Sequence, residues 1–510
     1  MIDAFSSAFG LLASSGAFER PPIDWHAVAP ELCLLGGGAL LTLIDVIWLE
    51  KGRSITSALA GIVMLIPIIP ILTLAIDSED RSMFKGAFVV DKYSLIIKAL
   101  FLLSGYLVVL LSTNYIAEGD YWENEYYGML ISSVLGMVLM ASARDLITIF
   151  VALELLSIPA YLLAAWRKKD HKSNEAGLKY YLMGVFASAI MLYGMSLIFG
   201  VSGSTILEEI NDSISGGGAN TPVITLGITF VIIGFGFKVS AFPFHTWAPD
   251  TYEGAPTPVT AFLAVASKAA GFVALMNLVV IGFIGQEDVF QPLIWILAAL
   301  SMTAGNVMAL RQTNIVRLMA YSGIAQAGFM LAPLAVAGEG PAIADKAVSA
   351  IVTYLVIYAA MNIGAFGIIL VVSRKTKTAD LESYNGLFRT SPSLAIVMTV
   401  FLASLAGIPP LGGWYAKFSV FTSLTSAGTN WGYGLAVVAA INAVIAFGYY
   451  GKIAMRMWVE DPHEALEGEV KVPVSLLAAL VLTAGTTIAF GVAPGIVTHF
   501  TDVSLIAFGG

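Results

Sequence analysis

The chain has 510 residues, of which 58% are hydrophobic and only 12% are charged, and its formal net charge is −9. An ordinary soluble domain carries about 25% charged residues, so this composition excludes a soluble globular protein. Apolar windows of about 20 residues recur along the chain, as expected for membrane-crossing helices, whereas an outer-membrane barrel would show short alternating segments. We therefore predict an all-α polytopic membrane protein surrounded by lipid, with no basic patch that indicates nucleic acid as a partner.

Fourteen apolar segments are predicted to be transmembrane helices. The 28 residues that precede them lack a basic start before an apolar core, so we predict an amphipathic or irregular lead-in rather than a signal peptide. To within several residues the segments lie at 29–49, 56–75, 93–113, 127–142, 146–165, 178–201, 222–242, 257–283, 291–310, 314–337, 348–373, 393–425, 433–451 and 473–499.

The basic residues are distributed unequally between the two ends of these segments. Sixteen of the 26 Lys and Arg residues lie in loops that follow odd-numbered segments, six lie on the opposite side and four lie within segments. Because Lys and Arg favour the cytoplasmic side, both chain termini are predicted on the other side of the membrane.

The segment spacing indicates an internal repeat. Segments 5 to 8 and 10 to 13 start at offsets of 168 to 176 residues, and the sequence from Gly136 resembles that from Gly305. Five helices per unit is an odd number, so the two units would be inverted relative to each other. Similar spacing can also arise by chance in a chain of many helices. The predicted parts are 1–126 with helices 1–3, 127–290 with the first five-helix repeat, 291–460 with the second, inverted repeat and 461–510 with helix 14.

Prolines interrupt the seventh and twelfth segments at equivalent places. Pro243 breaks the seventh, and Pro409 and Pro410 break the twelfth. Proline removes an amide donor and clashes with the preceding turn, so both helices are predicted to be broken. Broken helices at membrane depth persist only where protein or water satisfies the freed backbone groups, and such a pair in equivalent positions points to a transport site.

Four ionisable side chains lie inside apolar segments: Glu154, Lys238, Lys268 and Lys417. A charge at the centre of a membrane helix costs about 2.5–3.5 kcal/mol on insertion scales, so such residues usually mark an ion or proton path. Glu154 could control how tightly a nearby lysine holds its proton. Three lysines and one acid make a poor sodium site, because Na⁺ requires several converging oxygens, so protons are the expected cargo.

Other interpretations of these charges stay open. Glu154 could pair with a base only to hold helices together, and the lysines could extend toward the lipid headgroups. His245, just after the first break, is a further candidate for proton transfer, although it could simply bind freed carbonyl groups. Asp45 and Lys98 are predicted to be mainly structural.

Cys33 is the only cysteine, so the chain can form no internal disulfide and offers no cysteine-based iron–sulfur or zinc site. The five histidines are scattered along the sequence, so we expect neither haem nor a di-iron centre. Any redox chemistry is therefore expected on other subunits, with no metal or cofactor in this chain.

Several long motifs resemble one known family. LELLSIPAYLLAAWRKKDHK, GFKVSAFPFHTWAPDTYEGAPTP, YSGIAQAGFM and GIPPLGGWYAKF resemble the N subunit of bacterial respiratory complex I, NADH:quinone oxidoreductase, one of its three antiporter-like membrane subunits. The resemblance extends from about residue 29 to about residue 500. It implies that Glu154, Lys238, Lys268 and Lys417 are the proton-transfer residues of helices 5, 7, 8 and 12.

The resemblance also implies a proton-translocating subunit of a translocase enzyme in the bacterial inner membrane, with both termini periplasmic. NAD, FMN, iron–sulfur clusters and quinone would then belong to partner subunits, and neighbouring antiporter-like subunits would be direct partners. Two alternatives stay open: a subunit of an Mrp-type cation/proton antiporter, whose members share this lysine and glutamate pattern, and a purely structural membrane subunit.

Overall fold

The computed structural model describes residues 22–47, 53–118, 123–215, 221–468 and 470–505. Within these ranges the chain is almost entirely helical, and eleven helical segments are long and apolar enough to cross a membrane. Three shorter apolar helices lie at Ala29–Ile44, Pro222–Lys238 and Pro392–Ala406. The all-helical polytopic class is thereby confirmed. Most of the predicted lead-in and the side chain of Asp45 lie outside what the structure describes.

The α-helices follow the predicted segments closely, and several segments are divided into two helices. They are α2 (Ala29–Ile47), α3 (Arg53–Leu65), α4 (Ile68–Asp77), α5 (Lys92–Glu118), α6 (Glu123–Ser142), α7 (Leu146–Ala164), α8 (His171–Ser202), α9 (Leu207–Ser215), α10 (Thr221–Lys238), α11 (Trp247–Gly254), α12 (Thr257–Phe262), α13 (Lys268–Asn277), α14 (Glu287–Leu310), α15 (Ile315–Leu331), α16 (Pro341–Thr376), α17 (Leu387–Thr390), α18 (Pro392–Ala406), α19 (Gly412–Ser426), α20 (Asn430–Val459), α21 (Val474–Val492) and α22 (Gly495–Thr501).

Short elements connect these helices. Strands β1 (Arg81–Met83) and β2 (Phe88–Val90) form a small antiparallel hairpin, which the sequence pattern did not predict. Two π-helical segments, η2 (Leu263–Ser267) and η3 (Leu278–Gly282), flank α13. The 3₁₀ segments are η1 (Phe84–Gly86), η4 (Ile284–Gln286), η5 (Ala332–Glu339), η6 (Leu381–Tyr384) and η7 (Glu464–Leu466).

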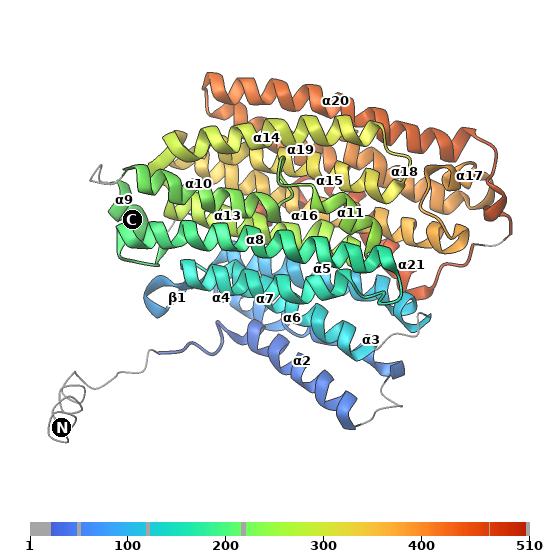
Figure 1. The fold of residues 1–510 in the computed structure, drawn as a ribbon, viewed down its shortest axis with the longest axis horizontal. Coiled ribbons are helices and arrows are strands. Elements are labelled where there is room, and N and C mark those ends of the chain that lie inside the picture. Colours follow the sequence, from blue (N-terminus) through green and yellow to red (C-terminus); the bar gives the residue numbers. More distant parts are fainter. Residues whose placement is uncertain (1–21, 48–52, 119–122, 216–220, 469, 506–510) are drawn as a thin grey trace.

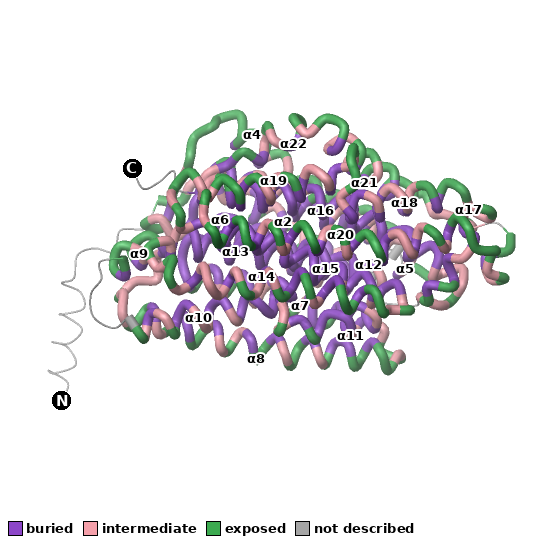
Figure 2. The backbone as a smooth tube through the Cα atoms, turned by 90° about the horizontal axis from the view of Figure 1, so that it is seen from above, coloured by how far each residue is buried: buried purple, intermediate pink, exposed green. Residues whose placement is uncertain are grey.

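The long helices lie side by side, with α2 at one edge of the bundle and α20 at the opposite edge (Figure 1). The centre is formed by the segments Thr257–Gly282, Ile315–Glu339 and Pro341–Thr376. In each of them 94% of the most apolar 18-residue stretch is buried, against 28% in the peripheral α20. Figure 2 shows the same contrast between a buried interior and exposed outer helices. An apolar exterior and a close-packed interior are what a bilayer requires of a helical bundle.

Proline determines where predicted helices divide. The predicted segment 56–75 bends at Pro67, which lies between α3 and α4. The break at Pro243 separates α10 from α11, and the break at Pro409 and Pro410 separates α18 from α19, as predicted. Both breaks therefore leave backbone groups inside the bundle that need new partners.

Similar local contacts recur 169 residues apart. Asp145 caps α7 and Asn314 caps α15, each by accepting backbone N–H groups of the first helical turn. Gly136 of α6 and Gly305 of α14 each contact the backbone of the next helix so closely that an added Cβ would lie 2.6 Å from an amide nitrogen. The contacted residues are Ala152 and Leu156 for the first glycine, and Tyr321 and Ala325 for the second. The α6–α7 and α14–α15 pairs therefore pack in the same way.

A buried ion pair joins the N-terminal helix to the bundle. Lys98 Nζ of α5 lies 2.8 Å from a carboxylate oxygen of Glu31 in α2, and their side chains are 0% and 8% exposed. The predicted structural role of Lys98 fits this contact, although its partner was not predicted. A buried pair of this kind is costly to break because the remaining charge stays desolvated.

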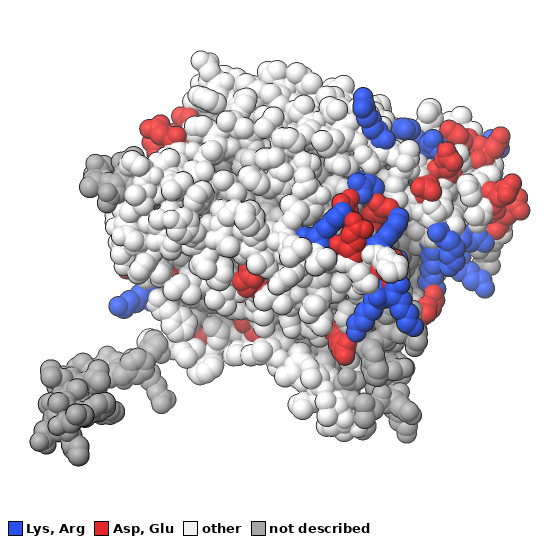
Figure 3. Space-filling model, in the orientation of Figure 1, with Lys and Arg blue, Asp and Glu red and all other residues white. Residues whose placement is uncertain are grey.

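A second group of charges holds α11, the helix that follows the first break. Arg317 of α15 lies 2.7 Å from Asp250 and 3.0 Å from Glu253, while Lys179 contacts Asp250 at 2.6 Å and Lys172 contacts Glu253 at 2.9 Å. We call these five residues the α11 charge cluster. It appears as the group of blue and red atoms over α8 and α11 in Figure 3. The cluster ties α11 to helices on both sides of it.

The α11 charge cluster also perturbs its two acids. Burial alone would raise the pKa of Asp250, but hydrogen bonds from Lys179 and Arg317 outweigh it and lower that pKa. Burial would likewise raise the pKa of Glu253. Hydrogen bonds from Lys172 and Arg317 outweigh this effect and lower that pKa. A lowered pKa in the folded state means that ionisation of the group stabilises the fold.

Removing Lys98 should destabilise the protein strongly. Lys98→Met leaves the Glu31 carboxylate buried without its cation, which typically costs about 3–5 kcal/mol. The double variant Glu31→Gln/Lys98→Met removes both charges and should recover most of this loss. Thermal unfolding of the purified protein measures both effects, and equal destabilisation by the single and double variants would contradict the argument.

Acid should weaken the α11 charge cluster. Its stabilisation is present above the ordinary pKa values of 3.8 for Asp250 and 4.5 for Glu253, and is lost as the pH falls through their lowered values. Arg317→Met should lower the unfolding temperature by about 1–2 °C at neutral pH, which corresponds to about 1–2 kcal/mol for a chain of this length. It should also make the acid-induced loss begin at higher pH, because one cation that keeps both acids ionised is gone. Unfolding curves recorded from neutral to acidic pH test this.

The matched control for this experiment is Arg389→Met. Arg389 pairs with Asp461 at 2.8 Å, but these side chains are 54% and 92% exposed, so their interaction is screened by water. If Arg317→Met behaves like Arg389→Met at every pH, the α11 charge cluster contributes nothing to stability.

Candidate functional site

The four predicted charges lie in the interior helices and at the two breaks. Lys238 is the last residue of α10, Lys268 is the first residue of α13 and Lys417 lies in α19. The three lysines are only 4%, 2% and 5% exposed, so their side chains end inside the protein rather than among lipid headgroups. Glu154 of α7 is half-buried. The structure therefore places three lysine side chains in the interior of the helical bundle.

Lys238 contacts two neutral hydroxyl groups. Its Nζ donates to Ser157 Oγ at 2.8 Å and to Tyr180 Oη at 3.3 Å. Glu154 lies one turn before Ser157 on α7 and accepts a hydrogen bond from Ser188 at 2.6 Å. Among the described residues no ion pair joins Glu154 to Lys238. Lys238 instead contacts Ser157, which lies one turn after Glu154 on α7.

Lys268 follows a π-helical segment, which the sequence pattern did not predict. Its Nζ donates to the backbone carbonyl of Gly323 in α15 at 2.8 Å. The segment Leu263–Ser267 adds a residue to the turn just before Lys268, and such π-bulges occur often at functional sites. Ser267 at its end also lies within hydrogen-bonding reach of the Tyr180 hydroxyl, which binds Lys238. Two hydroxyl groups therefore extend from Lys238 to Ser267, the residue that precedes Lys268.

Lys417 binds the end of the helix that precedes the second break. Its Nζ donates to the carbonyls of Leu405 at 3.1 Å and Ala406 at 2.8 Å, the last two residues of α18. A cation is favoured at a helix C-terminus because unpaired carbonyl groups and the helix dipole give that end negative potential. The Phe329 ring lies 5.0 Å from the same Nζ. The broken helix thus supplies the partners of its own lysine.

Each of the three lysines lies against a glycine. A Cβ on Gly271 would lie 3.0 Å from Lys238 Cγ, and a Cβ on Gly323 would lie 3.0 Å from Lys268 Nζ. At Gly407 a Cβ would lie 2.9 Å from Lys417 Cδ, and the backbone there has a φ of 93°. Any larger residue would displace the lysine or strain the backbone. These glycine–lysine contacts were not predicted, because each pair is separated in the sequence and meets only through packing.

Two further polar residues of α15 were also missed, Ser322 and Gln326. They are 1% exposed and lie four residues apart, so they share one face of the helix. Both belong to the motif YSGIAQAGFM, in which a polar residue every fourth position was the available signal. Gln326 and Lys417 donate to the same carbonyl, that of Leu405.

His245 lies in the first break, apart from the lysines. It is 5% exposed, its ring stacks on Phe242 with a centroid distance of 5.1 Å, and it lies 6.4 Å from the Tyr321 ring. Its Nδ1 atom makes no hydrogen bond to the described residues. The neighbouring break is satisfied by other groups: Trp247 Nε1 donates to the Phe237 carbonyl at 3.1 Å. A role for His245 in proton transfer stays a prediction.

A metal centre has no visible basis in this arrangement. Within the described ranges, no group of three or more His, Cys, Asp or Glu residues is placed to hold a metal ion. The interior cations instead contact hydroxyl and carbonyl oxygens. Chemically, these contacts can hold a protonated amine and can still accommodate the neutral amine.

Known proteins share both the sequence and the fold. The family described as NADH:quinone oxidoreductase/Mrp antiporter, transmembrane, matches residues 143–446. Subunit N of NADH-quinone oxidoreductase from Trichlorobacter lovleyi is 38% identical over 485 residues, which cover 94% of this chain and 96% of that protein. A chain of respiratory complex I from Thermus thermophilus superposes with a TM-score of 0.77 at 30% identity, covering 92% of this chain and 98% of that chain.

A chain of the Mrp complex from Dietzia sp. has the same fold, with a TM-score of 0.80, and covers 94% of this chain and 97% of that chain. Its identity is only 17%, so this likeness concerns the fold alone. The resemblance predicted from the motifs is confirmed by the higher identity to N subunits across nearly the full length. The chain therefore belongs to the NADH:quinone oxidoreductase/Mrp antiporter transmembrane family and, within it, to the N subunits of NADH-quinone oxidoreductase.

Proposed function

We propose that this subunit moves protons across the membrane through Glu154, Lys238, Lys268 and Lys417, driven by quinone reduction in partner subunits. One observation carries the proposal: among the described residues, the three buried lysines donate hydrogen bonds only to neutral oxygens and form no ion pair. A buried lysine without a fixed counter-ion can exist in either protonation state, and intramembrane ionisable residues of this kind typically form proton relays. Glu154 would influence how tightly Lys238 holds its proton, because it lies one turn from Ser157, to which Lys238 donates.

The order of contacts supports a lateral path. Tyr180 and Ser267 connect Lys238 to the start of α13, and Lys268 contacts α15 at Gly323. Hydroxyl groups both accept and donate hydrogen bonds, so they can pass a proton between amines. The path would then continue along α15 toward Lys417.

The fourteen-helix, inverted-repeat architecture is part of the same proposal. If the three short apolar helices also cross the membrane, they and the eleven long segments would make fourteen crossings, of which the seventh and twelfth are broken. The matching caps and glycine contacts 169 residues apart support repeats over 127–290 and 291–460, flanked by 1–126 and 461–510. Because each unit has five crossings, the units would be inverted, with one break serving each membrane face.

Polar openings occur on both sides of the proposed path. The α11 charge cluster lies at the end where basic loops predict the cytoplasm. On the opposite, periplasmic side, a cavity of about 550 Å³ borders α16 and α19 and is lined by Lys92, Ser419, Ser423 and His499 among others. The cavity and Lys417 share helix α19, to which Ser419 and Ser423 also belong. Both termini would face the periplasm of a bacterial inner membrane.

Cofactors and partners follow from membership of the complex. NAD, FMN, iron–sulfur clusters and quinone would be held by other subunits, and neighbouring antiporter-like subunits would contact this one within the membrane. The alternative is Mrp-type cation/proton exchange, which the shared fold leaves as the second candidate. A set of converging carboxylates would favour it, but the lysines here contact hydroxyl and carbonyl groups and would repel a metal cation.

Removing the first two charges should impair proton translocation more than assembly. In inside-out membrane vesicles, Glu154→Ala and Lys238→Ala should lower the protons moved per NADH oxidised at least about twofold, since a lost proton carrier commonly costs more than that. The amount of assembled complex, measured on native gels, should change less. Lys169→Ala removes an exposed charge of the neighbouring loop, outside the α11 charge cluster, and serves as the control. Full pumping by an assembled Glu154→Ala/Lys238→Ala variant would refute the proposal.

Gly323→Ala should displace Lys268 while leaving the fold intact. The added methyl group would lie 3.0 Å from Lys268 Nζ and 3.3 Å from Tyr358 Oη. Alanine favours a helix interior over glycine by about 1 kcal/mol, so stability should not fall. The expected result is reduced proton translocation at normal unfolding temperature. Gly485→Ala is the matched control, because an added Cβ at this helical glycine would have nothing within 4 Å. Equal pumping by the two variants would contradict the proposal that Lys268 must lie against Gly323 to transfer protons.

A further inference from the structure

The stretch between Lys268 and Lys417 is occupied by one carboxamide, that of Gln326. Lys268 contacts α15 at Gly323, one turn before Gln326, and Lys417 contacts the Leu405 carbonyl on the other side. Gln326 is 1% exposed, so its amide must be satisfied by protein groups. A proton that moves between the two lysines along this face of α15 would therefore meet the Gln326 side chain.

Three hydrogen bonds hold the Gln326 amide in place. Its Nε2 donates to the Leu405 carbonyl at 3.1 Å and to Tyr450 Oη at 3.2 Å, and its Oε1 accepts from the Tyr354 hydroxyl. Tyr450 also shares a hydrogen bond with Ser322 at 2.5 Å. Both amide hydrogens are thus used, and the amide orientation is fixed by its tyrosine and carbonyl partners.

The direction of these hydrogen bonds blocks proton transfer. A relay needs each group to accept a proton on one side and to donate one on the other. At the Leu405 carbonyl, Gln326 Nε2 and Lys417 Nζ both donate to the same oxygen. A carbonyl has no hydrogen to pass on, and an amide nitrogen has no free lone pair to accept one. Two donors therefore point at the Leu405 oxygen from either side, and no proton can pass from one to the other through it.

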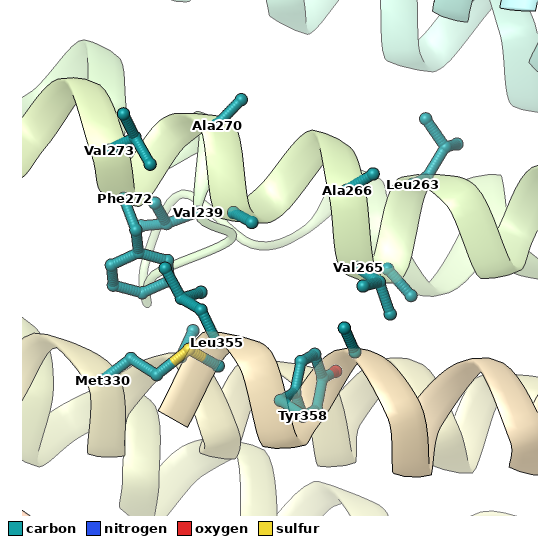
Figure 4. Packing of buried hydrophobic residues seen from close by; sticks show 14 of the residues in the cluster. Val239, Leu263, Val265, Ala266, Ala270, Phe272, Val273, Met330, Leu355 and Tyr358 are labelled. Atoms are coloured by element: carbon teal, nitrogen blue, oxygen red, sulfur yellow. The ribbon is translucent and has the colours of Figure 1, made fainter. Parts of the chain in front are cut away.

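Hydroxyl groups that could carry the proton lie beside this block. Tyr358 Oη and Lys268 Nζ lie 3.3 Å and 3.0 Å from the same point, the Cβ position of Gly323. The Tyr358 hydroxyl and both polar atoms of the Asn362 side chain make no hydrogen bond to the described residues, although they are buried. Figure 4 shows Tyr358 on α16 facing Val265, just before the start of α13. Tyr354 is one turn away from Tyr358 on α16.

We propose that Gln326 closes the step between Lys268 and Lys417, and that protons pass only when its amide leaves the Leu405 carbonyl. In the open step, the Lys268 ammonium gives a proton to a neighbouring hydroxyl and becomes a neutral amine. Each hydroxyl passes on its own proton, and the Lys417 amine takes up the last one and becomes an ammonium. The summed charge of the two lysines does not change. This inference rests on the proposed function, and it adds the residue that would prevent back-flow.

Two substitutions separate closure from a merely structural role. Gln326→Met keeps a similar length but makes none of the three hydrogen bonds, so it should open the step. In inside-out vesicles the pH gradient should then decay at least about twofold faster after NADH is consumed, and fewer protons should be moved per NADH. Gln326→Glu keeps the acceptor for the Tyr354 hydroxyl, loses the donors to the Leu405 carbonyl and to Tyr450 Oη, and adds a titratable group beside Lys417. It should give a proton yield that depends on pH from about 6 to 9, which Gln326→Met should not show.

The control is Asn277→Asp, the same amide-to-acid change at a buried site, where Asn277 Nδ2 donates to the Ala143 carbonyl at 3.1 Å and contacts no lysine. A wild-type decay rate and proton yield in assembled Gln326→Met would overturn the inference. So would a loss of NADH oxidation and pumping that simply follows the amount of assembled complex. Lys238→Ala is measured in parallel, because full pumping by that variant would refute the proposed function itself, whereas silent Gln326 variants alone would refute only the closure.

Discussion

Every buried polar group in this bundle must find its partner inside the protein, because the surrounding lipid offers none. The two helix breaks determine how that requirement is met. At the second break, α18 ends with free carbonyl groups, and Lys417 binds two of them. At the first break, Trp247 and Ser301 satisfy backbone groups near Lys238. Interrupted helices therefore create the polar sites that make buried lysines tolerable.

The same requirement explains why the lysines contact neutral oxygens rather than carboxylates. A fixed ion pair such as Lys98–Glu31 is stable but cannot readily change its protonation state, because each charge depends on the other. Hydroxyl and carbonyl partners stabilise an ammonium less strongly and leave room for the neutral amine. The described part of the chain thus contains two kinds of buried lysine: Lys98, which pairs with a carboxylate, and three that donate to hydroxyl and carbonyl oxygens, as the proposed proton transfer requires.

Features that depend on the local residue type could be predicted from the sequence. Proline located both breaks, and charges in apolar segments located Glu154 and the three lysines. Contacts with a backbone group, or with a residue far along the chain, could not be predicted in this way. The residues Leu263–Ser267 contain neither proline nor glycine, so their sequence does not predict the π-helical turn before Lys268. The Leu405 carbonyl and the Glu31 partner of Lys98 depend on tertiary packing, which no local pattern encodes.

The glycines that lie against the lysines have a consequence for how this sequence can vary. Gly407 is required by its positive φ whatever residue stands at 417, so it is constrained twice. Gly271 and Gly323 have ordinary helical backbones, and only the lysine lying on each of them excludes a side chain. In relatives that lack one of these lysines, the opposing glycine would lose its constraint and could drift to alanine or serine. The two positions would then covary as a pair, although they lie on different helices.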